Sequence, residues 1–316
     1  MNYLERALEL AERGRGTTQP NPVVGAVLVR DGEIVGEGWH ERKGEPHAEV
    51  NALAAAGDGA RGATLHVTLE PCASWGSTPP CAQAVIDADV AKVVIGARDP
   101  NPAAAGGLDQ LRAAGVEVEV ADGELGFRAR RQIEAWLTWV AKGRPFVTYK
   151  AAMTLDGRLT LPGSRWVSGE ESRRLVHELR AASDAVAVGM GTVRADRPAL
   201  TAREVGAERQ PRRLAFGQSP LPAGVDLERL SGPLDQELAR LAQEGVQSLL
   251  LEGGPALATS FLRAGLIDKL LVFVAPVLAG AGPTFFDRLD GPVELLRLET
   301  RTVGEDVLLT AYVNAP

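Results

Sequence analysis

The sequence predicts an α/β protein made of two successive layered domains. Helical and extended segments alternate along the chain, which is typical of sheets covered by helices. The 316 residues suit two domains of roughly 100–200 residues each. The alternation is interrupted near the middle, at Lys142-Gly143-Arg144-Pro145. We therefore expect one domain over residues 1–143 and a second over residues 144–316.

In the first domain, the spacing of apolar residues predicts each element. Apolar residues from Leu4 to Ala11 recur at helical spacing, and Asp31-Gly32 is a hairpin signal between two extended runs. The expected elements are a helix at 4–11, strands at 23–29 and 33–39, a helix at 47–56, a strand at 64–69, a helix at 81–88, a strand at 92–97, a helix at 108–114, a strand at 116–120 and one long helix at 124–142.

In the second domain, the spacing of apolar residues and the turn signals again predict the elements. Glycines at Gly189-Met190-Gly191-Thr192 and Gly253-Gly254 follow predicted strands, where a backbone can approach a phosphate. The segment 200–232 is the least regular, being rich in Pro, Arg and Gly. The expected elements are a strand at 146–151, a helix at 170–182, strands at 184–188 and 213–216, a helix at 234–244, a strand at 246–251, a helix at 255–264 and strands at 269–275 and 306–313.

Composition indicates an ordinary globular protein. Apolar residues make up 45 % of the chain and charged residues 24 %, which leaves ample material for a core. No apolar run reaches the roughly 18–20 residues of a membrane span. Residues 1–14 alternate charge with Leu and Ala and lack the pattern of a secretory signal. We expect a cytoplasmic protein without a membrane partner.

Charge and aromatic content argue against a nucleic-acid partner. The chain has 41 acidic residues against 34 Lys and Arg, a net charge of −7, whereas a duplex-binding protein needs a basic face. Aromatic residues make up only 5 %, which is low for a protein that stacks on bases. A few arginines suffice for one phosphate, so a small anionic substrate remains compatible with this balance.

The residues with metal-binding chemistry cluster in the first domain. His47-Ala48-Glu49 is followed by Pro71-Cys72 and Pro80-Cys81, which contain both cysteines of the chain. One imidazole and two thiolates are three zinc ligands, and an open fourth position is the mark of a catalytic zinc site. Zinc lowers the pKa of a bound water to about 7. Glu49 is close enough to His47 to carry protons without being a ligand. The pattern favours hydrolytic deamination.

Two observations leave other interpretations of this cluster open. Zinc deaminases have His-x-Glu followed by Pro-Cys-x-x-Cys, whereas here eight residues separate Cys72 from Cys81. A structural zinc would need a fourth ligand, for which His40 or His66 could serve. Each short motif is common by chance. Their joint occurrence in this order favours the catalytic site.

Longer segments extend the pattern over nearly the whole chain. His47-Ala48-Glu49, Leu69-Glu70-Pro71-Cys72 and Gly76-x-Thr78-Pro79-Pro80-Cys81 together resemble the bifunctional deaminase–reductases of riboflavin biosynthesis, in which a longer loop joins the two cysteines. The resemblance continues in Asn21-Pro22-x-Val24-Gly25, Arg98-Asp99-Pro100-Asn101-Pro102, Lys150, Leu155-Asp156-Gly157, Ser164-x-Trp166, Gly191-Thr192-Val193-x-Ala195-Asp196-x-Pro198-x-Leu200 and Glu252-x-Gly254-Pro255.

The resemblance implies a fold, two reactions and two cofactors. The fold would be a cytidine-deaminase-like zinc domain over 1–143, followed by a dihydrofolate-reductase-like domain over 144–316. The first would use Zn²⁺ to hydrolyse the 2-amino group of 2,5-diamino-6-(5-phosphoribosylamino)pyrimidin-4(3H)-one. The second would use NADPH to reduce the ribosyl side chain of 5-amino-6-(5-phosphoribosylamino)uracil to ribityl. The expected partner is this small pyrimidine ribotide, and the family implies a homo-oligomer, a dimer or larger.

The resemblance also assigns site residues by motif. The zinc ligands would be His47, Cys72 and Cys81, with Glu49 as the catalytic residue and Asn21 as a substrate contact. The NADPH site would include Ala152, Trp166, Thr192, Asp196, Gly254, Pro255, Ala256, Leu257, Ala258, Thr259 and Ser260, together with Ser219 or Gln218. The reductase substrate would contact Lys150, Ser164, Arg180, Leu200, Arg203 and Glu252.

The chain departs from the family pattern in places. Ser74 stands where a histidine is usual, and Arg197 stands where a second acid often follows Asp196. The reductase half is shortened between Ser219 and Gly245. Three rival functions are a monofunctional deaminase with a degenerate reductase domain, a nucleic-acid base deaminase and a zinc-stabilised scaffold.

Overall fold

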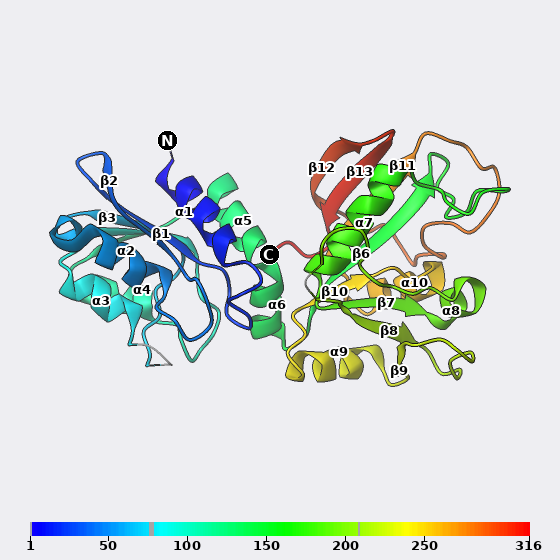
Figure 1. The fold of residues 1–316 in the computed structure, drawn as a ribbon, viewed down its shortest axis with the longest axis horizontal. Helices are drawn as coiled ribbons and strands as arrows, with labels where there is room; N and C mark the ends of the chain where they lie inside the picture. Colours follow the sequence, from blue (N-terminus) through cyan, green and yellow to red (C-terminus); the bar gives the residue numbers. More distant parts are fainter. Residues whose placement is uncertain (1, 76–78, 208) are drawn as a thin grey trace. The chain divides into compact units, whose positions relative to one another are not determined.

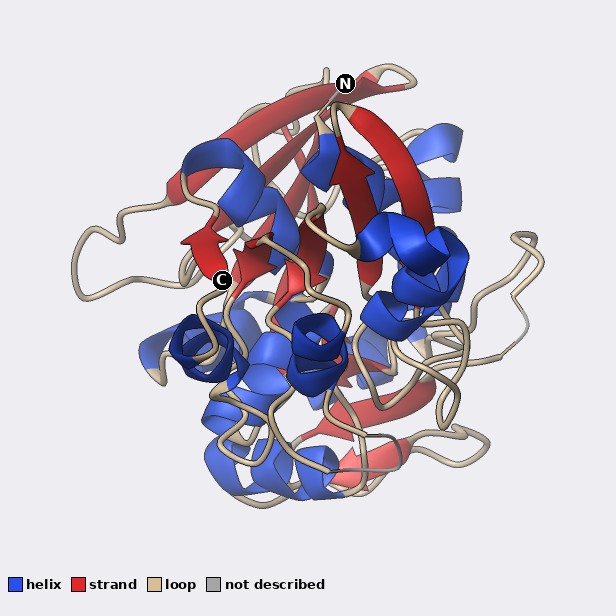
Figure 2. Ribbon diagram, turned by 90° about the vertical axis from the view of Figure 1, so that its left-hand side faces the viewer, coloured by secondary structure: helices blue, strands red, loops and turns tan. Residues whose placement is uncertain are grey.

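The structure is a computed structural model that describes residues 2–75, 79–207 and 209–316. The chain forms two compact units, Met1–Lys142 with Pro316 and Gly143–Ala315 (Figure 1). The division falls one residue before the expected boundary between 143 and 144, and Pro316 groups with the first unit instead of the second. Each unit is a sheet with helices against it, which confirms the predicted α/β class (Figure 2).

The first unit contains a five-stranded sheet in the order β2-β1-β3-β4-β5. The strand β1 is antiparallel to both β2 and β3, whereas β3, β4 and β5 run parallel to one another. The expected hairpin turn is present, because Arg30 pairs with Glu33 while Asp31 and Gly32 have φ of 54° and 82°. The strands are β1 (Gly25–Arg30), β2 (Glu33–Trp39), β3 (Thr64–Leu69), β4 (Lys92–Ala97) and β5 (Glu117–Val120).

Helices cover both faces of this sheet (Figure 1). Side chains alternate along a strand, so Val27 packs with the first helix on one face while Ala26 and Leu28 pack with the second helix on the other. The helices α1 and α5 share the first face, and α2, α3 and α4 share the second. The helices are α1 (Tyr3–Ala11), α2 (Ala48–Ala56), α3 (Cys81–Asp87), α4 (Gly107–Ala113), α5 (Gly123–Gln132) and α6 (Glu134–Lys142), with single turns η1 (Glu12–Gly14) and η2 (Gly57–Ala60).

Two glycines of β2 let α2 approach the sheet at backbone distance. A Cβ atom on Gly38 would lie 2.4 Å from Ala52 N and 2.5 Å from Ala48 O, and one on Gly36 would lie 2.4 Å from Ala52 O. The obstructing atoms belong to the backbone, so they cannot move without shifting the helix. The position of α2 therefore depends on the absence of side chains at these two places.

The second unit contains an eight-stranded sheet in the order β12-β13-β11-β6-β10-β7-β8-β9. The neighbouring strands β11, β6, β10, β7, β8 and β9 run parallel to one another. The strand β13 pairs antiparallel with both β11 and β12. The strands are β6 (Phe146–Thr154), β7 (Ala185–Gly189), β8 (Arg212–Phe216), β9 (Glu228–Leu230), β10 (Ser248–Leu251), β11 (Lys269–Ala275), β12 (Leu296–Val303) and β13 (Asp306–Tyr312).

Helices again cover both faces of the central strands. Ala185 and Ala187 pack toward α9 (Leu234–Gln243) and α10 (Pro255–Arg263), whereas Val186 and Val188 pack with residues of α7 (Glu170–Ala182) and α8 (Met190–Asp196). Strands buried on both faces are hydrophobic at every position, as the sequence of β7 shows. The core of the second unit therefore lies on both sides of β6, β10 and β7.

The structure corrects several expected elements. The long helix predicted at 124–142 is two helices, because Ile133 between them has φ −120° and ψ 21°. Three α-helices or strands were not predicted: α8, where two glycines suggested a turn, the short β9, and β12, whose residues are almost all exposed and whose apolar alternation stops after Leu298. Within the described residues, no helix is long and apolar enough to cross a membrane.

Replacing Gly38 by alanine should destabilise the first unit, because the new methyl group must push α2 away from β2. Overpacking of this kind costs about 1–3 kcal/mol of unfolding free energy. Denaturant titration of Gly38→Ala should show this loss. Ile34→Ala, an exposed change on the same strand, is the control and should have little effect. A Gly38→Ala protein as stable as the wild type would contradict the close approach.

Candidate functional site

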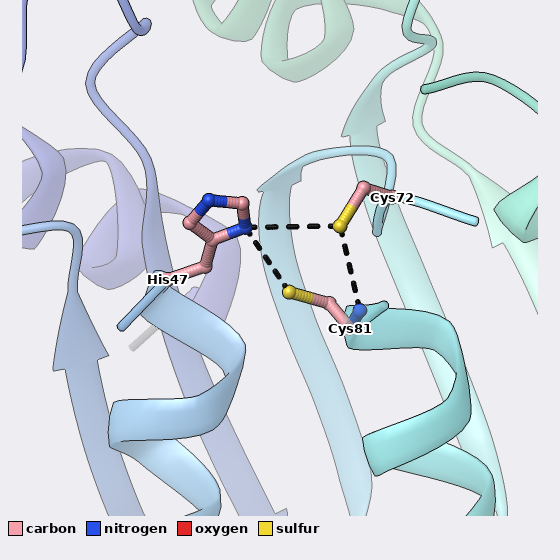
Figure 3. A group of neighbouring side chains, drawn as sticks. All are labelled: His47, Cys72 and Cys81. Carbon is pink, nitrogen blue, oxygen red and sulfur yellow. Dashed lines mark hydrogen bonds between the residues drawn. The ribbon is translucent and has the colours of Figure 1, made fainter. Parts of the chain in front are cut away.

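Three predicted zinc ligands meet at the starts of two helices on the same face of the first sheet. His47 precedes α2, Cys72 follows β3, and Cys81 is the first residue of α3. The Nδ1 atom of His47 lies 3.2 Å from Cys81 Sγ and 3.7 Å from Cys72 Sγ (Figure 3). The backbone N–H of Cys81 donates to Cys72 Sγ at 3.4 Å. The three ligand atoms therefore converge on one point.

This donor set fits zinc. One imidazole nitrogen and two sulfurs lie within 4.8 Å of one another, and they are the only such group among the residues that the structure describes. Neither histidine considered as a fourth ligand belongs to this group. His40 packs against His47, with ring centroids 5.2 Å apart, but its Nε2 lies 3.3 Å from the Asn21 amide nitrogen, and His66 packs on Tyr3. Three ligands without a fourth are typical of catalytic zinc.

Glu49 lies beside this cluster in the first turn of α2. Its side chain is 3 % exposed. Burial raises the pKa of Glu49 to about 7, although the nearby His47 opposes the shift. The hydrogen bond from Cys81 lowers the pKa of the Cys72 thiol, and His47 lowers it further. The site thus combines a soft ligand set with a carboxyl group that can hold a proton near neutral pH.

A cavity of about 360 Å³ opens in front of these residues. Asn21, the predicted substrate contact, lines it together with His47, Glu49 and Cys72. Trp136 and Trp139 of α6 also line it; their helical spacing was visible in the sequence, but their position beside the metal ligands was not. The motif residues Gly76 and Thr78 lie outside the described residues.

Two acids form a polar wall of the same cavity. Glu70 is 8 % exposed and accepts hydrogen bonds from the backbone N–H groups of Asp99 at 3.2 Å and Leu108 at 3.1 Å. Burial raises the pKa of Asp99 to about 6, and the charge of Glu70 adds to the shift. Glu70 therefore holds the two loops together. Asp99 also lines the cavity, and its Oδ1 accepts a hydrogen bond from the backbone N–H of Asn101 at 2.7 Å.

The second unit contains a cavity of about 630 Å³ at the carboxyl ends of β6, β10 and β7. Ligands of open α/β sheets bind at this edge. Most residues predicted for the reductase line this cavity, namely Lys150, Ala152, Trp166, Arg180, Thr192, Asp196, Arg203, Glu252, Gly254, Pro255, Ala256 and Leu257.

Six predicted residues lie outside that lining. They are Ser164, Leu200, Ser219, Ala258, Thr259 and Ser260. Leu200, Ala258 and Thr259 are buried, and the Ser260 hydroxyl donates to its own helix at Ala256 O. A helix presents only part of its surface to a ligand, so a continuous run such as 254–260 cannot line a cavity throughout.

A network of three charges forms one wall of the second cavity. Arg180 donates to both carboxylate oxygens of Glu252, from Nε at 2.6 Å and from Nη2 at 2.9 Å. Lys150 Nζ lies 3.7 Å from the same carboxylate. Burial alone would raise the pKa of Glu252, but Lys150 and Arg180 outweigh it and lower the pKa. Arg180 therefore holds Glu252 while also lining the cavity, and its predicted contact with the substrate stays a prediction.

Other cations face this cavity with fewer partners. Within the described residues, Arg203 Nη1 donates to the hydroxyl of Thr201 at 3.0 Å, and the Arg203 side chain forms no ion pair. Arg165 and Arg173 place their guanidinium carbons 4.9 Å and 5.4 Å from the Trp166 ring centroid. Both arginines line the cavity but were not predicted as site residues, although Arg165 adjoins Trp166 in the chain.

Family models match both units. The model described as "Cytidine and deoxycytidylate deaminase zinc-binding region" covers residues 1–97, and "RibD C-terminal domain" covers residues 145–309. The "Riboflavin biosynthesis protein RibD" of Aquifex aeolicus is 40 % identical over 98 % of this chain and 97 % of its own length. The Escherichia coli protein of the same name is 39 % identical, with 97 % of both chains covered.

The chain belongs to the RibD family of riboflavin biosynthesis proteins. Two solved structures agree over 98 % of this chain and 97 % of their own. Acinetobacter baumannii RibD has a TM-score of 0.82 at 35 % identity. The Thermotoga maritima "diaminohydroxyphosphoribosylaminopyrimidine deaminase/5-amino-6-(5-phosphoribosylamino)uracil reductase" has the same TM-score at 33 % identity.

Family membership confirms the predicted class of enzyme and its cofactors. The chain is a bifunctional deaminase and reductase of riboflavin biosynthesis, with Zn²⁺ and NADPH as cofactors. The Aquifex alignment spans 347 positions, more than the 316 residues of this chain, so this chain is shorter than that RibD in places. The roles of individual site residues remain predictions.

Replacing Cys81 by serine should remove zinc and abolish ammonia release, because one of two soft ligands is lost. Elemental analysis of purified protein gives the metal content directly. Ala88→Ser, after the end of α3, is the control and should keep one zinc per chain. Zinc and deamination retained together in Cys81→Ser would place the metal elsewhere.

Proposed function

We propose that residues 1–143 deaminate 2,5-diamino-6-(5-phosphoribosylamino)pyrimidin-4(3H)-one and that residues 144–316 reduce the resulting 5-amino-6-(5-phosphoribosylamino)uracil to its ribityl form. The observation that carries this proposal is the convergence of His47, Cys72 and Cys81 beside the buried Glu49, in a chain whose other unit holds a separate cavity rich in cations. The Thermotoga maritima protein of similar structure is named for the same two activities.

In the deaminase cavity, the ligands His47, Cys72 and Cys81 would hold zinc through Nδ1 and two Sγ atoms. Zinc, when bound, supplies Lewis-acid activation of water. Glu49 would carry protons between the attacking water, the ring nitrogen and the leaving amine, since its carboxyl group adjoins the ligands and exchanges protons near neutral pH. Asn21, on the cavity wall, would orient the pyrimidine.

In the reductase cavity, NADPH supplies a hydride when bound. Gly254 to Leu257 form the start of α10 and line the cavity, so the free N–H groups of Gly254, Ala256 and Leu257 would receive the cofactor's phosphates. Pro255 has no N–H to donate. Lys150 and Glu252 form the wall where the sugar would lie. Arg203 would bind the sugar phosphate, while Arg180 would keep Glu252 charged and in place.

We also propose a homo-oligomer, a dimer or larger, in the cytoplasm. The exposed apolar side chains Leu296 and Leu298 on the edge strand β12, with Val307 on β13, support association. A reducing compartment suits two cysteines that must remain thiols to act as ligands. Analytical ultracentrifugation tests the association, and a monomer at micromolar concentration would contradict it.

Glu49→Gln should keep zinc but lose deamination by about 10²–10⁴-fold, the usual contribution of a positioned acid–base group. The amide has the same shape but cannot accept and release the proton. Zinc content and ammonia release are measured on the same sample. Near-normal ammonia release would reject the proton-carrying role, and loss of zinc would make Glu49 a structural residue of the site.

Arg203→Ala should weaken NADPH oxidation with the deaminated ribotide while leaving ammonia release unchanged. A charged hydrogen bond to phosphate contributes roughly 1.5–3 kcal/mol, so productive binding should fall about 10- to 150-fold. Arg213→Ala is the control, because Arg213 pairs with the exposed Asp226 outside the cavity lining. A folded Arg203→Ala protein that reduces normally, or that loses deamination equally, would place the phosphate elsewhere.

A further inference from the structure

Arg194 is an exposed arginine of α8 whose side chain meets a hydroxyl group instead of an acid. Its Nη1 lies 3.4 Å from Ser219 Oγ, and within the described residues Arg194 forms no ion pair. Three other arginines of the second unit, Arg212, Arg213 and Arg240, hold carboxylates. A cation and a hydroxyl group side by side are a donor pair for a dianionic phosphate.

The order of the strands indicates which part of NADPH reaches this pair. Lys150 of β6 and Glu252 after β10 mark the substrate end of the cavity, so the nicotinamide has to lie there. Next to β10 comes β7, followed by α8, and next to β7 comes β8, whose following loop carries Ser219. These strands are parallel, so all of these loops lie at one edge of the sheet.

An extended dinucleotide along this edge therefore has its adenosine toward β8. The phosphates between its two halves would meet the backbone at Gly254, where α10 begins. Beyond them along the sheet lie Thr192, which lines the cavity, and then Arg194 and Ser219, which lie outside its lining. The short helix α8 packs on both β7 and β8, which places it between the two ends (Figure 1).

The two charged residues of α8 point in different directions. Asp196 lines the cavity, whereas Arg194 reaches toward the loop after β8. Residues two apart on a helix are separated by roughly 200° around its axis, which explains the divergence. Arg229 Nη1 donates to Gln218 O at 2.7 Å, so a second cation holds the loop that carries Ser219. Arg194 and Arg229 thus bring two cations to the loop that carries Ser219.

We propose that Arg194, together with the Ser219 hydroxyl, binds the 2′-phosphate of NADPH and makes this reductase discriminate NADPH from NADH. The two cofactors differ only in that phosphate, and an arginine near the adenosine ribose is how dinucleotide sites accept it. The inference rests on the proposed reductase function of the second unit. It adds a residue that determines cofactor specificity at the outer end of the site.

Calorimetric titration of the full-length protein with NADP⁺ and NAD⁺ tests this directly, without turnover. Arg194→Gln should weaken NADP⁺ binding by roughly 10- to 100-fold, the effect of one charged hydrogen bond to phosphate, and leave NAD⁺ binding unchanged. Adenosine 2′,5′-bisphosphate should bind the wild type more tightly than AMP, and Arg194→Gln should remove the difference. Arg194→Lys should restore part of it. Arg174→Gln, an exposed arginine of α7, is the matched control.

The outcomes separate this inference from the proposed function. Equal loss of NADP⁺ and NAD⁺ affinity in Arg194→Gln would show a structural role and overturn the assignment. Unchanged NADP⁺ affinity in that variant would overturn it as well. If the wild type binds neither cofactor, the reductase function itself fails. Kinetics give a second readout, since the ratio of kcat/KM for NADPH over NADH should fall in Arg194→Gln while deamination stays at the wild-type rate.

Discussion

Charge that is buried away from water must be compensated within a few ångströms, and both cavities of this chain are organised by that constraint. In the first unit, the buried carboxyl of Glu49 lies beside His47, which opposes the effect of burial only in part, so that the pKa of Glu49 is about 7 and the group can hold a proton. In the second, Glu252 is held by Arg180 and approached by Lys150. Removing one partner of such a network costs about 3–5 kcal/mol, because the remaining charge stays buried. Each group is therefore fixed before a substrate arrives.

The fold supplies these positions through helices that begin, and strands that end, at one edge of each sheet. His47 and Cys81 lie at the starts of α2 and α3, which cover the same face of the first sheet. Gly36 and Gly38 let α2 lie against the backbone of β2 on that face. Glu252 follows β10 between its parallel neighbours β6 and β7. In both units the backbone fixes where each functional side chain lies. Each side chain can therefore be assigned a role of its own.

Local signals in the sequence predict a large part of this structure. The turn at Asp31-Gly32 and the extended runs on either side of it were enough to predict the hairpin, including all of β2. The strand β12 gives a weaker signal, because its side chains are exposed on both faces and its apolar alternation stops after Leu298; pairing with β13 defines it. The break at Ile133 likewise depends on how α5 and α6 pack, which periodicity alone does not reveal.

Some residues of the candidate sites could likewise be predicted from the sequence, whereas others could not. His47, Cys72 and Cys81 could be predicted because soft ligands are rare in this chain and their chemistry is distinctive. The pairing of Arg180 with Glu252 could not, since the two are 72 residues apart and only the sheet brings them together. Family resemblance named many residues of the second cavity, but it could not tell which side of α10 faces the ligand.

The central claim is that two independent chemistries act in sequence on one ribotide, and metal removal tests it most directly. Chelator-treated protein would be given each substrate separately, with ammonia, NADPH oxidation and product mass followed together. We expect ammonia release from the diaminopyrimidine ribotide to stop and return with added zinc, while the preformed deaminated ribotide still gains two hydrogens from NADPH at the normal rate. Loss of both activities on chelation, in protein that remains folded, would contradict the account.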